Sequence, residues 1–322
     1  MKILITGATG FVGSHLNERL RSEGHETFLL VRNEKKAKEF NLEGNFISGS
    51  LSADKELQWL SNLPEDLDSV VHVAGIVHSP KDEDFVNINT LGTKNLFKQL
   101  HDKYNKLHFV FISSLAAGGP SQNSPRMISD IDAPISAYGK SKLDAEHEIE
   151  KMNEKFSLSI IRPPMIIGPR DPAIVDIFKM VKSQVIIGPG MNFLEKSYSY
   201  IFISDLIDII TKITTGGIEG KFYSSHSQSI TFSDIIETIK SEMKIKRLIN
   251  IPIPHGLLTA VATASSWLPI SSRFTKDKAK ELIQNSWCCS NEEVLSIGLE
   301  PKITLKEAIQ ITKKDYEQRN WL

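Results

Sequence analysis

The chain has 322 residues, of which 40% are hydrophobic, so it can bury a large core as one large domain or two moderate ones. Its 38 basic and 39 acidic residues give a net charge of -1, which excludes an overall field that favours nucleic acid or an anionic membrane. We therefore expect a small-molecule substrate and no nucleic-acid partner.

Cysteine usage and apolar runs indicate the cellular environment. Cys288 and Cys289 are adjacent, so a disulfide between them would be strained, and the sequence has no cysteine spacing typical of a metal site. The apolar run at Met1 is too short for a signal peptide, and the apolar stretch at residues 255–270 is shorter than the roughly 20 residues of a membrane span. These features predict a cytoplasmic protein with no metal site and no membrane span.

Short β-branched segments alternate with amphipathic segments through the first half of the chain, which predicts βαβ units. Predicted strands occupy residues 2–6, 26–31, 45–48, 69–73, 108–113 and 158–162. Predicted helices between them include residues 12–22, 87–104 and 136–153. The fold class is therefore α/β, with the doubly wound parallel sheet of a Rossmann domain.

Prolines and glycines become dense after Arg162, which predicts loops and short elements. Residues 198–214 instead predict a strand and a helix, starting at Asp205, that return to the main sheet. We predict a dinucleotide-binding domain at residues 1–165, joined by residues 198–225. A smaller discontinuous substrate-binding domain would comprise residues 166–197 and 226–322.

A glycine-rich loop joins the first predicted strand to the first helix. Gly7 permits a tight turn, Gly10 lets the backbone approach a pyrophosphate, and Gly13 allows close packing. The helix N-terminus offers N–H groups to the anion. An ordinary glycine-rich turn is the alternative, which the position at the head of a βαβ unit disfavours. We expect a dinucleotide to be lined by Gly7, Thr9, Gly10, Phe11, Val12 and Gly13.

The end of the second predicted strand indicates which dinucleotide is bound. An acidic residue there would accept hydrogen bonds from a ribose 2′-OH. The chain instead has Arg32, whose guanidinium suits a 2′-phosphate, with Lys36 nearby. The sequence therefore predicts NADP(H), with NAD(H) as the alternative. In the other interpretation, Arg32 and Lys36 belong to a solvated basic helix face.

Tyr138 and Lys142 stand four residues apart in a predicted helix and project from the same face. Hydride transfer from an alcohol needs a base for the hydroxyl proton, and the reverse reaction needs an acid at the same place. Lowering a tyrosine pKa from about 10 to about 7 takes roughly 4 kcal/mol. One ammonium about 4 Å away supplies roughly that much at an effective dielectric of 20. Lys142 therefore activates Tyr138 only in a partly dry cleft; a solvated helix face is the alternative.

Two hydroxyls, those of Ser113 and Ser114, follow the fifth predicted strand. They lie at the carboxyl edge of the sheet, where open α/β sheets bind ligands. We predict that Ser114 donates to the substrate oxygen, with Ser113 as the second choice, although a serine pair is also typical of a turn. Together with Tyr138, Lys142 and the glycine loop, the pair predicts an oxidoreductase.

These motifs resemble the extended short-chain dehydrogenase/reductase family, or NAD-dependent epimerase/dehydratase superfamily, over nearly the whole chain. The resemblance also rests on Val73-Ala74-Gly75, on the helix that contains Asn89, and on Arg162-Pro163-Pro164. It implies that Asn89 helps organise the active site, and it implies a homodimer through the helices at residues 87–104 and 136–153. Further cofactor contacts implied by the resemblance are Val73, Ala74, Gly75, Ser113, Tyr138, Lys142, Pro163 and Met165.

Within the family, residues 161–172 look most like the 3β-hydroxysteroid dehydrogenase branch, which implies an alcohol and carbonyl pair on a hydrophobic substrate. Two departures from common family patterns are present. Gly118-Gly119 replaces the Tyr-Gly typical of sugar-nucleotide epimerases, and Ser50-Leu51 stands where Asp-Leu is common. The resemblance therefore implies that the adenine contact at Ser50 and Leu51 is made by a hydroxyl or is lost.

Three functions are compatible with these motifs. The first is an NADP(H)-dependent alcohol dehydrogenase or carbonyl reductase. The second is a nucleotide-sugar epimerase or dehydratase that retains NAD, and net consumption of cofactor separates it from the first. The third is a non-catalytic dinucleotide sensor, in which an intact set of Ser114, Tyr138 and Lys142 would be superfluous.

Overall fold

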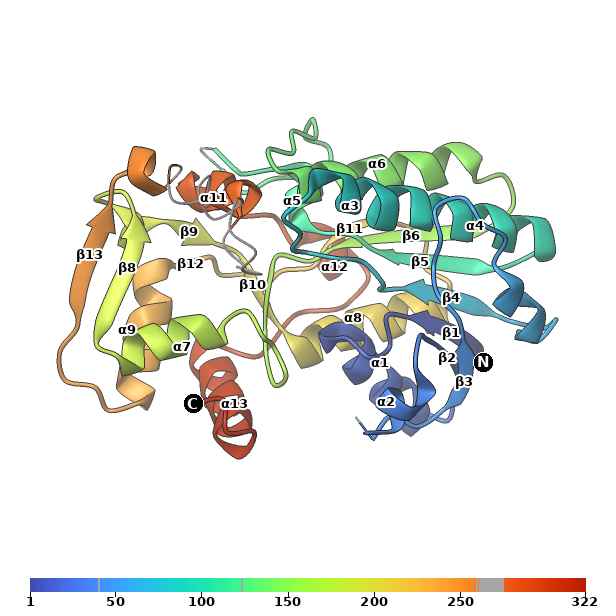
Figure 1. Ribbon diagram of the computed structural model, residues 1–322, viewed down its shortest axis with the longest axis horizontal. Helices are drawn as coiled ribbons and strands as arrows, with labels where there is room; N and C mark the ends of the chain where they lie inside the picture. Colours follow the sequence, from blue (N-terminus) through green and yellow to red (C-terminus); the bar gives the residue numbers. More distant parts are fainter. Residues whose placement is uncertain (40, 123, 259, 261–274) are drawn as a thin grey trace. The chain divides into compact units, whose positions relative to one another are not determined.

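The computed structural model describes residues 1–39, 41–122, 124–258, 260 and 275–322 (Figure 1). The chain forms two compact units, each built from separate stretches of sequence. Unit 1 comprises Met1–Ala117, Ala137–Arg162 and Ile207–Phe222, and unit 2 comprises Gly118–Ser136, Pro163–Leu206 and Tyr223–Leu322. The units change after residues 117, 136, 162, 206 and 222, whereas the predicted domains change after residues 165, 197 and 225.

Unit 1 is built on a seven-stranded sheet with the strand order β11-β6-β5-β4-β1-β2-β3. The strands are β1 Lys2–Thr6, β2 Glu26–Val31, β3 Asn45–Ser48, β4 Ser69–His72, β5 His108–Ile112, β6 Ser157–Arg162 and β11 Gly220–Tyr223. Neighbouring strands from β3 to β6 pair in parallel. The predicted Rossmann sheet is confirmed, and each predicted strand matches one of β1 to β6 to within one residue.

Helices cover both faces of this sheet: in Figure 1, α4 and α6 lie over one face and α1 and α8 over the other. They are α1 Phe11–Ser22, α2 Glu34–Glu39, α3 Asp82–Phe85, α4 Gly92–Lys103, α5 Leu115–Gly118, α6 Ala137–Met152 and α8 Ile203–Gly216, with a 3-10 helix, η1, at Gln58–Asn62. The helix predicted at residues 87–104 differs, because a π-helix, η2 at Val86–Leu91, precedes α4. Such π-turns occur often at functional sites.

The core of unit 1 is apolar on both sides of the sheet, as expected for parallel strands covered by helices on each face. Aromatic rings fill the space between the sheet and α4. The centre of the Phe97 ring lies 5.0 Å from that of Phe109 and 5.6 Å from that of Phe156. This packing holds α4 on the sheet near the amino ends of β5 and β6.

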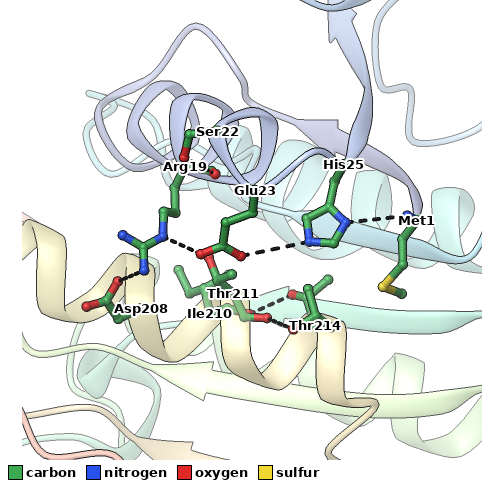
Figure 2. A network of polar contacts seen from close by, with 10 residues as sticks. Met1, Arg19, Ser22, Glu23, His25, Asp208, Ile210, Thr211 and Thr214 are labelled. Atoms are coloured by element: carbon green, nitrogen blue, oxygen red, sulfur yellow. Dashed lines mark hydrogen bonds and ion pairs between the residues drawn. The ribbon is translucent and has the colours of Figure 1, made fainter.

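A polar network at the end of α1 reaches α8 (Figure 2). Arg19 contacts Glu23 Oε1 at 2.6 Å and Asp208 of α8 at 3.0 Å, and His25 lies 3.8 Å from Glu23. The Arg19 side chain is 46% exposed, so each pair contributes at most about 1 kcal/mol. Apolar packing therefore holds these helices on the sheet more than the network does.

Unit 2 consists of short strands and helices joined by loops. The strands β7 Met165–Ile167 and β10 Tyr200–Phe202 form one pair, and β8 Val185–Pro189 and β13 Ile249–Ile253 form another. A third sheet has the order β12 Ile230–Thr231, β9 Ser197–Tyr198 and β14 Ser286–Trp287. The helices are α7 Val175–Lys182, α9 Phe232–Glu242, α11 Lys276–Ile283, α12 Glu292–Ser296 and α13 Leu305–Gln318, with η3 at Phe193–Glu195.

Several predictions outside the sheet can be compared with this architecture. The strand and helix predicted at residues 198–214 appear as β10 and α8, with α8 starting two residues before Asp205. Most of the apolar stretch at residues 255–270 lies outside the described residues. Among the residues that are described, no helix is long and apolar enough to cross a membrane. Cys288 and Cys289 are buried free thiols.

Candidate active site

The loop between β1 and α1 requires glycine at two positions. Gly7 has a φ of +73°, and a Cβ there would lie 2.7 Å from the Ala74 nitrogen. A Cβ at Gly13 would lie 2.2 Å from the Gly7 oxygen, because α1 packs directly on the turn. These two glycines therefore serve the tight turn and the close packing.

Gly10 differs, because packing within the chain does not explain it. It is exposed, and the nearest atom that a Cβ would meet is the Gly7 oxygen at 3.2 Å. Gly10 is the N-cap of α1, where no side chain caps the helix and no acidic residue occupies the first turn. A bare helix N-terminus of this kind fits an anionic pyrophosphate. Of the other predicted loop contacts, Thr9 is exposed, Phe11 is half-buried and Val12 is buried.

The residues predicted to contact the adenosine half of a dinucleotide follow β2 and β3. Arg32 is exposed directly after β2. Ser50 is exposed and Leu51 half-buried shortly after β3, and the Ser50 carbonyl accepts a hydrogen bond from Trp59 Nε1 at 3.1 Å. Because β2 and β3 are parallel neighbours, both segments lie at the same edge of the sheet. The side chain of Lys36 in α2 lies outside the described part of the structure.

The segment after β4 connects the glycine loop to the centre of the site. The Ala74 N–H donates to Thr6 Oγ1 at 3.2 Å. A Cβ at Gly75 would lie 3.0 Å from Asn89 Oδ1 and 3.3 Å from Lys142 Nζ. Gly75 therefore lies directly against two predicted site residues, and Val73 and Ala74 lead the chain to it.

Lys142 is a buried cation on α6, with 4% of its surface exposed. Its Nζ donates to the Ile112 carbonyl at 2.9 Å and lies 4.7 Å from the centre of the Phe111 ring. Burial lowers the pKa of Lys142 to about 8, and the nearby Glu146 carboxylate opposes that shift. Because this pKa is above 7, the charged form predominates at neutral pH.

Tyr138 lies one helical turn before Lys142 on α6, so both side chains project from one face. Tyr138 is half-buried, and the centre of its ring lies 6.1 Å from that of Phe85. Its carbonyl accepts a hydrogen bond from Ser141 Oγ at 2.8 Å. The low-polarity surroundings of Lys142 are those in which a cation strongly affects a phenol one turn away.

The two serines after β5 point to different partners. Ser113 is buried, and its hydroxyl donates to Glu146 Oε1. Ser114 is half-buried, and its Oγ accepts a hydrogen bond from the Ala116 N–H at 3.1 Å. A hydroxyl that accepts in this way keeps its own proton to donate. The geometry therefore favours Ser114 over Ser113 as a donor to a substrate.

Asn89, in the π-helix η2, is 1% exposed and holds the loop after β4. Its Oδ1 accepts from the Ile76 N–H at 2.8 Å, and its Nδ2 donates to the Ile76 carbonyl at 2.9 Å and to Ser141 Oγ at 3.0 Å. These bonds tie the Gly75 loop to α6. The Asn89 side chain therefore joins the loop after β4 to α6 through hydrogen bonds within the protein.

Sequence reasoning missed Glu146, which lies one turn after Lys142 and is fully buried. Arg162 Nε donates to its Oε1 at 2.9 Å and Arg162 Nη2 to its Oε2 at 2.6 Å. Lys221 Nζ also lies 3.1 Å from Oε2. The available signal was an acidic residue on the same helix face as Tyr138 and Lys142, together with an arginine at the end of an apolar strand.

His72 was also missed. It is fully buried at the end of β4, with its Nδ1 2.7 Å from Thr6 Oγ1 and its Nε2 2.8 Å from Thr93 Oγ1. Burial lowers the pKa of His72 to about 3, and the charge of Lys142 acts in the same direction. The neutral imidazole therefore joins β1, β4 and α4. A histidine within a short apolar strand was the only sequence signal.

The remaining predicted cofactor contacts, Pro163 and Met165, belong to unit 2. Pro163 is buried and follows β6, and Met165 is half-buried as the first residue of β7. Within the described part of the chain, no group of three or more His, Cys, Asp or Glu side chains could hold a metal ion.

Comparison with known proteins bears on this site. The sequence model of the NAD dependent epimerase/dehydratase family matches residues 3–223. The ceramide reductase of Caulobacter vibrioides is 27% identical over 327 residues, which cover 99% of this chain and 96% of that protein. The decarboxylating sterol-4-alpha-carboxylate 3-dehydrogenase of Candida albicans is 26% identical over 286 residues, covering 79% of each chain.

Solved structures agree with the fold. The UDP-glucose 4-epimerase of Thermus thermophilus, in a complex with NAD, matches with a TM-score of 0.75 at 20% identity, covering 98% of this chain and 99% of that one. The family model confirms the family that the motifs resemble, and this structural likeness shows the same fold over nearly the whole chain.

Proposed function

Because the chain belongs to the NAD dependent epimerase/dehydratase family, we propose that it interconverts an alcohol and a carbonyl on a hydrophobic substrate by hydride transfer. Tyr138 is the acid and base of the reaction, Lys142 tunes it, and Ser114 orients the substrate oxygen. Asn89 holds the loop and helix that carry them. The protein is an oxidoreductase of this family, and the substrate class and the residue roles are the proposal.

The observation that carries the proposal is the buried ammonium of Lys142, one turn from Tyr138. With a pKa of about 8, this group is mostly charged at neutral pH although it is desolvated. A charge in such surroundings stabilises a phenolate by several kcal/mol when the two groups are about 4 Å apart. The Ile112 carbonyl accepts a hydrogen bond from Lys142 Nζ, and this bond fixes the orientation of the Lys142 ammonium.

The chemistry follows from these positions. In the oxidation, the substrate hydroxyl gives its proton to the Tyr138 oxygen while the Ser114 hydroxyl donates a hydrogen bond to the same substrate oxygen. A dinucleotide held at the loop of Gly7, Gly10 and Gly13 would supply the hydride chemistry, with its nicotinamide taking the hydride of the carbinol carbon in the oxidation and returning it in the reduction. In the reduction, Tyr138 protonates the carbonyl oxygen. Lys142 stays charged throughout and favours the phenolate form of Tyr138.

We propose NADP(H) as the preferred cofactor, with NAD(H) as the alternative. The exposed guanidinium of Arg32 supports this preference, because it follows β2 where the adenosine ribose binds in this fold. Arg32 can donate to a 2′-phosphate but cannot accept from a 2′-OH. Ser50 and Leu51, at the same edge of the sheet, would border the adenine.

A hydrophobic substrate is supported by two relatives. Both are named for lipid substrates: a ceramide and a sterol carboxylate. The epimerase likeness keeps a second candidate open, namely a nucleotide-sugar epimerase or dehydratase with retained NAD. Gly118-Gly119, in place of the Tyr-Gly of the sugar-nucleotide enzymes, favours the lipid class.

Cofactor titration tests the binding half of this proposal without knowledge of the substrate. Tighter binding of NADPH than of NADH is expected, and Arg32→Asp is expected to reverse the preference. Lys35→Asp is the matched control, because Lys35 is exposed nearby in α2. An Arg32→Asp variant that still prefers NADPH would exclude the assigned role of Arg32.

Turnover with long-chain ketones, sterol ketones and UDP-glucose tests the chemical half. Tyr138→Phe and Ser114→Ala are expected to lose turnover and keep cofactor affinity, whereas Ser113→Ala is expected to lose stability first. Net consumption of NADPH with a lipid ketone supports the proposal. Conversion of UDP-glucose without net consumption would replace it by the epimerase, and turnover that survives Tyr138→Phe would remove the role of Tyr138.

A further inference from the structure

The outer face of the β8–β13 pair in unit 2 is apolar along its whole length. The strands are parallel, with Ile249 opposite Val185, Ile251 opposite Ile187 and Ile253 opposite Pro189. Alternate residues of a strand share a face, so these six residues form one surface. We call this surface the apolar ribbon. It comprises Val185, Ile187, Pro189, Ile249, Ile251 and Ile253.

The apolar ribbon is open to solvent at its amino end and middle, whereas Ile253 at its carboxyl end packs against Leu258 and Ala279. Ile249 is 63% exposed, Ile187 is 46% exposed and Ile251 is 43% exposed. The opposite face of β8 is different, because Ile186 is fully buried and the β8–β13 pair turns that side toward α7 and α9 (Figure 1). Beyond the carboxyl ends of the strands, Met191 is 82% and Leu257 is 55% exposed. Contiguous exposed apolar surface of this kind marks an interaction site.

A cluster of basic residues lies at one end of the apolar ribbon. Lys182 precedes β8 by three positions, and Lys244, Lys246 and Arg247 precede β13 by two to five positions. Because the strands are parallel, both groups meet at the same end, where the Ile249 N–H donates to the Gln184 carbonyl at 2.9 Å. These four side chains are exposed, and within the described residues none of them takes part in an ion pair.

We propose that the apolar ribbon docks on an anionic lipid bilayer. The isoleucines would enter the boundary between headgroups and acyl chains, while the basic end would contact headgroup phosphates and carboxylates. The basic cluster supplies the argument for this occupant, because its positive charge complements the anionic headgroups of such a bilayer. The net charge of -1 does not oppose docking, because the basic residues are concentrated at one end of the surface.

The surface is independent of the catalytic proposal, because it depends only on unit 2. Docking would nevertheless bring a lipid-modifying enzyme to the phase in which hydrophobic substrates dissolve. The catalytic and docking proposals can therefore fail separately.

Co-sedimentation of the full-length protein with vesicles tests the docking. Binding is expected to phosphatidylserine-containing vesicles, to weaken with salt, and to be much weaker to vesicles of phosphatidylcholine alone. Lys244→Gln with Lys246→Gln is expected to weaken binding about 30-fold, since each basic residue near an anionic surface contributes about fivefold. Lys302→Gln with Lys306→Gln is the matched control, because both of these lysines are exposed in unit 2 away from the apolar ribbon.

The apolar contribution has its own pair of variants. Ile249→Ser with Ile251→Ser is expected to weaken binding at least about tenfold, because each loses aliphatic surface that would be buried in lipid. Leu295→Ser with Ile311→Ser is the control, since both of these residues are 42% exposed on other elements. Melting temperature and NADPH affinity should be unchanged in all four double variants.

Three results would overturn the docking proposal. The first is no sedimentation with anionic vesicles, and the second is equal loss of binding in a variant and its control. The third is a change of mass by light scattering in the Ile249→Ser, Ile251→Ser variant with vesicle binding intact, which would assign the apolar ribbon to a second copy of the chain.

Discussion

Arg162→Met is expected to destabilise unit 1 strongly, because it leaves the Glu146 carboxylate buried without its main counter-ion. Both side chains are 0% exposed, and two contacts at 2.9 and 2.6 Å join them. Removal of one partner of a buried ion pair typically costs about 3–5 kcal/mol, since the remaining charge stays out of water.

The lower end of this range applies because Glu146 keeps two other partners. Lys221 Nζ lies 3.1 Å from Oε2, and the Ser113 hydroxyl donates to Oε1. We therefore expect a loss of about 3 kcal/mol in the free energy of unfolding. For a unit of this size that corresponds to a fall of roughly 6–12 °C in melting temperature. Urea unfolding followed by fluorescence, together with calorimetry, measures both quantities.

A double variant and a surface variant make this prediction specific. Glu146→Leu with Arg162→Met removes both charges, and it should recover most of the lost stability because apolar replacement of a buried pair is often neutral. Arg19→Met breaks the exposed contacts drawn in Figure 2 and should cost less than about 1 kcal/mol. The reasoning is refuted when the double variant is as unstable as Arg162→Met alone, or when Arg162→Met is as mild as Arg19→Met.

The glycine loop and His72 give further predictions. Gly13→Ala should lower both the melting temperature and NADPH affinity, because its Cβ would lie 2.2 Å from the Gly7 oxygen; normal stability would contradict the packing role. Gly10→Ala should cost less than about 1 kcal/mol of stability yet weaken NADPH binding at least about tenfold in a fluorescence titration; unchanged affinity would count against Gly10 as the pyrophosphate contact. The pKa of His72 is about 3 when folded and 6.5 in its ordinary state, so the unfolded chain binds the extra proton as the pH falls. The stability that the fold gains from a neutral His72 is therefore fully present above pH 6.5. It is lost as the pH falls toward 3, at up to about 1.4 kcal/mol per pH unit. The stability difference between the wild type and His72→Asn should follow that slope, and a difference independent of pH would show that His72 already accepts a proton in the folded state.

The sequence named those candidate site residues whose predicted roles depend on local spacing. Gly7, Gly10 and Gly13 lie on one turn, and Tyr138 and Lys142 lie one helical turn apart, so a few neighbouring residues specify each group. The strands β1 to β6 were predicted for the same reason, because alternation and apolar runs are local patterns. The interruption of the helix at residues 87–104 by a π-turn was not predicted, because hydrophobic periodicity does not register one inserted residue.

Polar pairing between distant elements was decided only by the tertiary structure. Glu146 and Arg162 come from a helix and a strand, and His72 bonds to Thr6, which is 66 positions away. The sequence ranked Ser114 before Ser113 as the donor to the substrate, but it did not show which partner either hydroxyl contacts. Packing of α6 against β5 turns Ser113 toward Glu146 and leaves Ser114 with its proton to donate. Sequence alone thus determined the fold class and the chemical groups, since both follow from local periodicity. Which groups are paired, buried and charged depends on contacts between segments far apart in the chain.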